Sequence, residues 1–189
     1  RLPSFRTPGV AIASYYKYER EQWGEQVLRF YRFQNDKPSN LGNEPLPDGL
    51  VNAFRVVTAD NLYAYVGRTQ VKYIPIGEQV ELNFGHDQEV LVKPVLMNWE
   101  KFDLQFDKDR QVVGWTTRET WEIELQNSKE IDVTLDVRRN FGGDWTLETA
   151  APFEQVDAQK VKFVRPLKSR EKAKLEYVLT TRHGLNAKR

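Results

Sequence analysis

The side chains best suited to nucleophilic or metal chemistry are sparse in this sequence. The chain contains no cysteine, which excludes thiolate nucleophiles, disulfides and cysteine-bound zinc. Its two histidines, His86 and His183, are far apart and have no further ligand at metal-binding spacing. The serines lack the Gly-x-Ser-x-Gly setting of a hydrolase nucleophile. We therefore predict no catalytic residue, no metal site and no cofactor.

Acidic residues are the remaining candidates for catalysis, because a glycoside hydrolase needs two carboxyl groups about 5 to 10 Å apart in a cleft. Glu122, Glu124, Asp132 and Asp136 are expected on outward strand faces, where carboxylates are solvated. The acidic turn at residues 107–110 lacks the glycine and the distal glutamate of an EF-hand loop. We predict that the protein is not an enzyme, and keep a carboxylate-dependent glycoside hydrolase as the enzymatic alternative.

Aromatic residues make up 12% of the chain and could bind a partner. Trp121 falls on the apolar side of its strand and Trp145 opens a strand after a Gly-Gly turn, so both are expected to be buried. Consecutive strand residues point to opposite faces, so we expect at least one of Tyr15 and Tyr16 to be exposed or to cover an interface. Exposed rings can stack on sugars or anchor a partner protein. The predicted ligand-binding candidates are Tyr15, Tyr16, Tyr18 and Trp23.

The elements that would position these side chains are β-strands. Residues 121–126 and 131–138 both alternate between apolar and polar side chains, which predicts strands with one wet face each. Keeping their apolar faces together disfavours a two-residue hairpin on Ser128-Lys129, and favours an odd-length loop or a crossing between sheets. Further strands are predicted over residues 27–33, 50–57, 62–71, 79–84, 89–96, 101–106, 111–116, 145–149, 160–164 and 173–181.

The sequence Gln-Asn-x-Lys occurs twice, at residues 34–37 and 126–129, each time directly after an alternating strand. Asparagine tolerates the left-handed backbone region and hydrogen-bonds to neighbouring backbone groups where a strand ends. We interpret both copies as structural rather than chemical. The repeat also suggests two related units.

These patterns predict an all-β protein, an antiparallel β-sandwich with two immunoglobulin-like units in tandem. The predicted units span residues 1–109 and 110–189, with the boundary in the turn at residues 107–110. One continuous sandwich domain is the alternative. The length of 189 residues allows either arrangement a real core.

The charge is balanced, with 28 Lys and Arg against 27 Asp and Glu. This mixture does not suggest a nucleic-acid partner. No stretch of eighteen apolar residues occurs, so no membrane span is predicted in this chain. The sequence begins without methionine or a signal pattern, and we expect it to be a processed or excised fragment.

Several motifs occur in a characteristic order between residues 15 and 182. The most specific is Leu41-Gly42 followed by Leu46-Pro-Asp-Gly49, and then Pro75 before a strand. The others are "LRFYRFQND", "LYAYVGRTQVKYIPIGEQVELNFGHDQEVLV", "WEIELQNSKEIDVTLDV", "GGDWTLE" and "KLEYVLTTR". Together they resemble the C-terminal β-rich domain of mucoidy-inhibitor-A-like bacterial proteins, a family of unknown function. One departure is that the His-Thr pair common before the proline is Tyr73-Ile74 here.

The family that the chain resembles has no established catalytic residue or cofactor, so none is carried over to this sequence. The resemblance implies an exported or envelope-associated protein. Residues and resemblance together predict a non-catalytic β-sandwich interaction module of a larger bacterial protein. The expected partner is a protein or the cell-envelope surface, and the expected location is extracytoplasmic: periplasm, envelope or secreted. The alternative is a carbohydrate-binding module that uses the exposed aromatics, with a glycan as partner.

Overall fold

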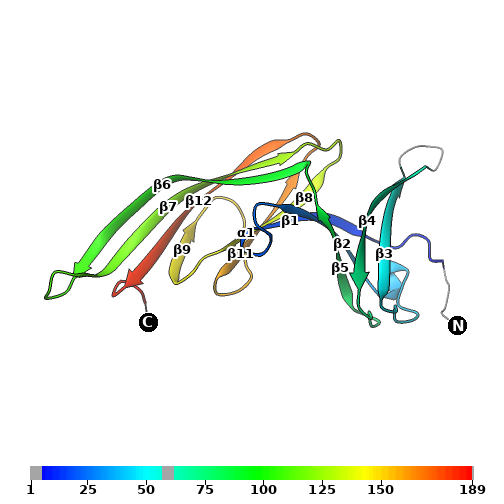
Figure 1. The fold of residues 1–189 in the computed structure, drawn as a ribbon, viewed down its shortest axis with the longest axis horizontal. Coiled ribbons are helices and arrows are strands. Elements are labelled where there is room, and N and C mark those ends of the chain that lie inside the picture. Colours follow the sequence, from blue (N-terminus) through cyan, green and yellow to red (C-terminus); the bar gives the residue numbers. More distant parts are fainter. Residues whose placement is uncertain (1–5, 57–61, 189) are drawn as a thin grey trace. The chain divides into compact units, whose positions relative to one another are not determined.

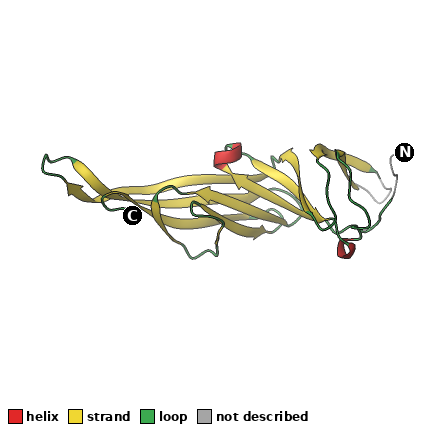
Figure 2. Cartoon of the chain, turned by 90° about the horizontal axis from the view of Figure 1, so that it is seen from below, coloured by secondary structure: helices red, strands yellow, loops and turns green. Residues whose placement is uncertain are grey.

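The computed structural model describes residues 6–56 and 62–188. The chain is mostly β, with 62% strand, one short α-helix and three sheets whose strands are mostly antiparallel. Figure 2 shows helix only at two short segments of the described chain. The predicted all-β class is therefore confirmed, and Figure 1 labels most of the elements, which are numbered in chain order.

The elements have the following bounds. The first part of the chain forms β1 (Ala13–Glu19), α1 (Arg20–Trp23), β2 (Val27–Gln34), the 3-10 helix η1 (Lys37–Ser39), β3 (Gly49–Val56), β4 (Tyr63–Val71) and β5 (Gln79–His86). The remainder forms β6 (Val90–Phe106), β7 (Val112–Asn127), β8 (Val133–Asn140), β9 (Asp144–Glu148), β10 (Glu154–Gln155), β11 (Lys160–Leu167) and β12 (Lys172–Gly184). The predicted strands agree within a few residues, and residue 57, the end of one of them, lies outside the described residues.

The strand order is β10-β11-β8-β1-β2-β5 in the first sheet, β6-β7-β12-β9 in the second and β3-β4 in the third. Two compact units are present: a smaller one of residues 1–16 and 28–87, and a larger one of residues 17–27 and 88–189. β1 and β2 each contribute residues to both units. The predicted boundary between residues 109 and 110 falls in the turn of the β6–β7 hairpin, within the larger unit.

The β6–β7 hairpin is longer than the sequence predicts. The separately predicted strands 89–96 and 101–106 form the single strand β6, and 111–116 and 121–126 form β7. The sequence between the two parts of β6 contains neither glycine nor proline, so no turn interrupts it. Instead the register shifts between Leu96 and Asn98, which adds a residue without ending the strand.

The link between β7 and β8 crosses from one sheet to another, as one of the two predicted alternatives required. Ile131 lies in this crossing loop and is 62% exposed, so its predicted place on an apolar strand face is wrong. Asp136 was expected on an outward face and is buried instead. Its carboxylate pairs with Arg138 at 3.0 Å, and this ion pair offsets part of the cost of its burial.

The core of the larger unit lies between β8–β11 and β7–β12. Leu135 of β8 is fully buried, as its alternation predicts, and so are Ile123 and Leu125 of β7. Phe163 of β11 stacks on Tyr177 of β12 with ring centroids 6.1 Å apart, which joins two different sheets. Stacked inner faces of this kind are the packing of a sandwich core.

Asn127, in the second Gln-Asn-x-Lys segment, is a buried hydrogen-bonding centre at the end of β7. Its backbone N–H donates to the Glu171 carbonyl at 2.9 Å. Its side-chain Nδ2 donates to the carbonyls of Lys168 and Ile131, both at 2.8 Å, and Oδ1 accepts from the Lys129 N–H at 3.0 Å. The Asn127 side-chain amide thus holds together the turn before β12 and the beginning of the loop that crosses to β8.

Asn35, in the first segment, does the same at the end of β2. Its backbone N–H donates to the Glu78 carbonyl at 2.9 Å. Nδ2 donates to the carbonyls of Pro75 at 3.1 Å and Ile74 at 3.3 Å, and Oδ1 accepts from the Gly42 N–H at 2.9 Å. This asparagine is fully buried, so all these bonds form away from water.

The two turns that these asparagines close have equivalent geometry. Each turn has four residues, 75–78 and 168–171, and ends in a glutamate whose carbonyl accepts from the asparagine backbone N–H. In both, the asparagine Nδ2 donates to the carbonyl of the first residue of the turn, Pro75 or Lys168. The third turn position has positive φ in both, 85° at Gly77 and 57° at Arg170. The structural interpretation of the repeat is confirmed, although the left-handed residue is the third one of the turn and not the asparagine.

Replacing Arg170 with glycine is expected to raise the free energy of unfolding by about 0.5 kcal/mol. A non-glycine residue in the left-handed region costs about 1 kcal/mol or more, which exceeds the entropic cost of a new glycine. The Arg170–Glu130 ion pair is exposed and contributes little. The matched change, Gly77→Ala, should lower the free energy by about 1 kcal/mol. Urea unfolding of both variants tests this, and shifts of the same sign would contradict it.

Candidate functional site

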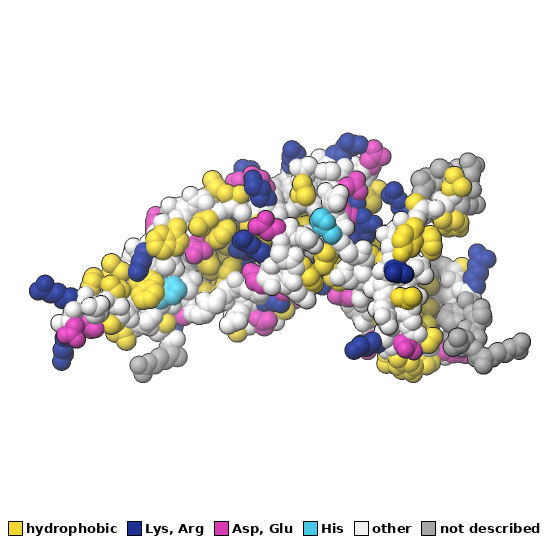
Figure 3. All heavy atoms as spheres, in the orientation of Figure 1, with side chains coloured by type: hydrophobic (Ala, Val, Ile, Leu, Met, Phe, Trp, Pro, Cys, Tyr) yellow, Lys and Arg dark blue, Asp and Glu magenta, His cyan; other side chains and the backbone are white. Residues whose placement is uncertain are grey.

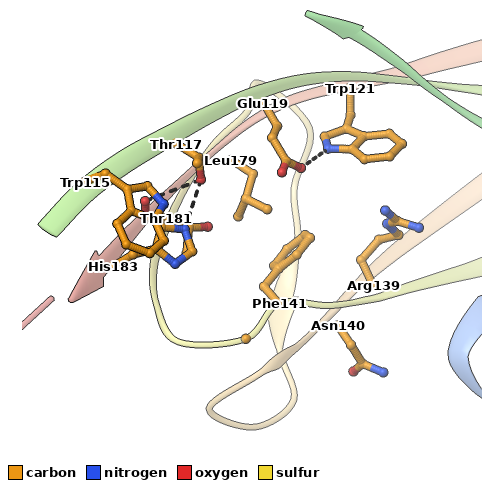
Figure 4. A pocket seen from close by; sticks show the side chains of 11 residues that line it. Trp115, Thr117, Glu119, Trp121, Arg139, Asn140, Phe141, Leu179, Thr181 and His183 are labelled. Carbon is orange, nitrogen blue, oxygen red and sulfur yellow. Dashed lines mark hydrogen bonds between the residues drawn. The ribbon is translucent and has the colours of Figure 1, made fainter. Parts of the chain in front are cut away.

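A groove of about 400 Å³ opens on one face of the larger unit, a size within the usual range for small-molecule sites. We call it the β7–β12 groove, because alternate residues of these two strands form its floor. Figure 4 shows its side chains from close by. Its aromatic lining consists of Trp115, Trp121, Phe141 and His183, and its polar lining of Thr117, Glu119, Arg139, Asn140 and Thr181.

Strand pairing brings the floor residues together. β12 pairs with β7 so that His183 lies opposite Trp115 and Thr181 lies opposite Thr117. Opposite residues of an antiparallel pair share a face, so these side chains enter the groove side by side. The end of β8 and the turn after it, residues 139–142, supply the other wall.

One end of the groove is held by stacking. The Trp115 and His183 rings are 5.0 Å apart and nearly parallel, and Lys101 Nζ lies 4.5 Å from the Trp115 ring centroid. Thr117 Oγ1 and His183 Nε2 are 3.2 Å apart, within hydrogen-bonding distance. These contacts fix both rings before any ligand arrives.

The other end contains the groove's one lining carboxylate, Glu119, and a buried arginine. The Trp121 indole donates to Glu119 Oε2 at 2.8 Å, as the dashed line in Figure 4 marks. Arg139 is only 7% exposed, and its guanidinium lies 5.0 Å from the Trp121 ring centroid. Its Nε donates to the Tyr177 hydroxyl at 3.0 Å. Burial raises the pKa of Tyr177 to about 12, so this hydroxyl stays neutral and does not balance the guanidinium charge.

Arg139 is incompletely satisfied. Its Nη1 is buried and has no hydrogen-bond partner. Across residues 6–56 and 62–188, no carboxylate lies within ion-pair distance of it. A buried polar atom without a partner is uncommon in folded proteins, and a buried charge without a counter-charge costs folding free energy.

The predicted aromatic candidates lie elsewhere. Tyr15, Tyr16 and Tyr18 are 7%, 4% and 0% exposed, and Trp23 is half-buried. Neither Tyr15 nor Tyr16 is exposed, so the first of the two predicted alternatives, an exposed ring, is wrong. β1 is an interior strand of its sheet, and its residues from Tyr15 to Glu19 are all buried, so both of its faces are covered.

The tryptophans expected in the core are less buried than predicted. Trp121 and Trp145 are both half-buried, and Trp121 lines the groove. The signal that could have found this site is the spacing Trp115-x-Thr-x-Glu-x-Trp121, which places every named side chain on one strand face. The partners on β8 and β12 could not be inferred from that pattern.

The carboxylates considered for a glycoside hydrolase form ion pairs with basic side chains. Lys174 pairs with Glu122 at 2.8 Å. Lys168 pairs with Asp132 at 2.8 Å, and this hydrogen bond lowers the pKa of the Asp132 carboxyl. Among the described residues, no group of three or more His, Asp or Glu side chains is placed to hold a metal ion. Asp107 Oδ1 accepts the backbone N–H groups of Asp109 and Gln111 within its own turn.

A second surface lies on the β6–β7 hairpin, which we call the hairpin surface. Its apolar side chains are between 37% and 59% exposed: Leu96, Met97, Trp99, Phe102, Leu104, Phe106 and Val112. Figure 3 shows hydrophobic side chains gathered over this hairpin, with charged ones at its turn. Trp99 lies opposite Glu119 and Phe102 opposite Thr116, which are on different faces of β7, so both faces of the hairpin carry exposed rings.

No helix among the described residues is both long and apolar enough to cross a membrane. No protein-family model, curated protein or solved structure matches this chain.

Proposed function

We propose that the chain is a non-catalytic interaction module that binds a partner protein through the hairpin surface. The observation that carries the proposal is the run of large, exposed apolar side chains on two paired strands, from Leu96 to Phe106 and at Val112. Monomeric proteins rarely expose contiguous apolar patches beyond a few hundred Å², and larger ones mark interaction sites.

Side chains, rather than backbone, are expected to make the contact. β6 is the edge strand of its sheet, and exposed edges invite further strands to pair. This edge carries Lys93, Pro94 and Lys101, together with register shifts near Leu96 and after Phe102. Each of these features opposes strand addition. A partner that holds the hairpin from both faces, with apolar surface against Trp99 on one face and Phe102 on the other, fits this surface best.

Site-specific photo-crosslinking in the source cells tests the proposal. A benzophenone amino acid at Met97, which is 59% exposed, is expected to give a protein adduct of defined mass. The matched control is the same amino acid at Ile131, which is 62% exposed but lies outside the hairpin. The adduct at Met97 should disappear in a Trp99→Lys, Phe102→Lys background. Adducts of equal yield at both positions, or none at Met97, would contradict the proposal.

The resemblance to the β-rich domain of mucoidy-inhibitor-A-like proteins extends the proposal to location. It favours an exported or envelope-associated protein in which this module binds a protein or envelope surface. We further propose that the two units are immunoglobulin-like. The equivalent turns closed by Asn35 and Asn127, one in each unit, support that view.

A further inference from the structure

We propose that the β7–β12 groove is a binding site for a sugar acid, a small hydroxyl-rich ring that carries a carboxylate. The groove shares no lining residue with the hairpin surface, although Trp99 of that surface lies opposite Glu119 on the same face. The inference rests on the charges and donors that line the groove, whose side chains Figure 4 shows from close by.

The requirement for an anion comes from Arg139. This residue lines the groove and is only 7% exposed. Its Nη1 is buried and has no hydrogen-bond partner. A guanidinium is always charged and matches a carboxylate in geometry. A ligand carboxylate would satisfy the free donor and pair directly with the guanidinium, which no carboxylate among the described residues does within ion-pair distance. Violations of this kind are expected at functional sites, where they are offset elsewhere in the structure.

The requirement for hydroxyl donors comes from Glu119. Its carboxylate accepts one bond, from the Trp121 indole at 2.8 Å, and is half-buried in the groove. Two carboxylate oxygens can accept several hydrogen bonds, so acceptor capacity remains. An inorganic anion would be repelled here, whereas a ligand hydroxyl would donate. The ligand must therefore combine an anionic group with donors.

The neutral polar residues favour hydroxyls over an ammonium group as those donors. Asn140 and Thr181 line the same groove, and each can both donate and accept. Several groups of this kind around one hollow suit hydroxyls distributed around a ring. Trp115 and Trp121 provide apolar surface for the carbons of that ring. An amino acid concentrates its donors in one ammonium group, which accepts no hydrogen bond and would leave the donors of Asn140 and Thr181 without a partner.

Isothermal titration calorimetry with D-glucuronate, D-glucose and L-leucine tests the proposal. Glucuronate is expected to bind at least about tenfold more tightly than glucose, because a charge-assisted hydrogen bond contributes about 1.4 kcal/mol or more. Arg139→Gln should remove this preference, and Glu119→Gln should weaken glucuronate and glucose alike. The matched control is Arg118→Gln, on the other face of β7, which should change neither affinity.

A second measurement keeps the test independent of how the variants fold. In the wild-type chain, glucuronate should shift the indole N–H resonances of Trp115 and Trp121, and leave that of Trp23 unchanged. Absence of glucuronate binding, glucose binding of equal strength, or tighter binding of leucine would each overturn the proposal. Photo-crosslinking at Met97 is independent of these outcomes, so failure here and failure of the hairpin proposal are distinguishable.

Discussion

Leu135→Ala is expected to lower the free energy of unfolding by about 2–5 kcal/mol. The Leu135 side chain is fully buried on β8, between its neighbours on β11 and the facing strands of the second sheet. Truncation removes the transfer free energy of the lost carbons and leaves a cavity in a packed core. Urea unfolding followed by tryptophan fluorescence measures the change.

The matched control is Leu104→Ala, because Leu104 is 45% exposed on the hairpin surface. This variant should stay within about 0.5 kcal/mol of the wild type. A loss of free energy at Leu135 as small as the loss expected at Leu104 would show that Leu135 does not lie in the core. An unchanged slope of free energy against urea concentration would show that both variants still unfold in one step.

Asn127→Ala is expected to cost about 3 kcal/mol, because it leaves buried backbone groups without partners. The lost bonds are those from Nδ2 to the carbonyls of Ile131 and Lys168, and that from the Lys129 N–H to Oδ1. Asn127→Asp should also destabilise, since it would place a carboxylate oxygen against two carbonyl oxygens. Thermal or urea unfolding tests both changes.

Two further variants separate this explanation from a general sensitivity to asparagine replacement. Asn35→Ala should cost a similar amount, because Asn35 is fully buried and makes equivalent bonds in the smaller unit. Asn98→Ala should have little effect, because the Asn98 side chain is exposed and bonds only to Glu100. A small loss at Asn127 with a large one at Asn98 would contradict the proposed role.

The predictions from sequence succeeded where a strand has one wet face. Leu125 and Leu135 alternate with polar neighbours, and both are buried as that pattern requires. They failed on β1, where Tyr15 to Glu19 are all buried. An interior strand covered on both faces has no alternation to detect, and its lysine and glutamate are buried through pairing that periodicity does not reveal. Glu19, for example, accepts from Lys160 at 2.5 Å, far along the chain.

The β7–β12 groove could not be predicted from sequence, because it depends on which strands pair. Its residues come from β7, the end of β8 and β12, and only the pairing of Thr181 with Thr117 and of His183 with Trp115 brings them together. Arg139 was missed because arginine is mostly exposed in proteins and the predicted strand ends at residue 138. Residue 139 nevertheless continues the alternate positions Leu135 and Val137, which are buried, so the pattern itself points inward there. The turn asparagines were foreseeable as strand ends, but their reach to Lys168 and Pro75 was not.

The distortion of β6 near its turn opposes strand pairing between two molecules at this sheet edge. Asp103 has a φ of 53°, and its carbonyl accepts from Asn186 Nδ2 at 2.7 Å, so the irregular backbone is anchored by the C-terminal turn. A strand distorted in this way is a poor template for the pairing of further strands. We therefore expect the edge of β6 to resist the addition of strands from other molecules, which is the first step toward fibrils.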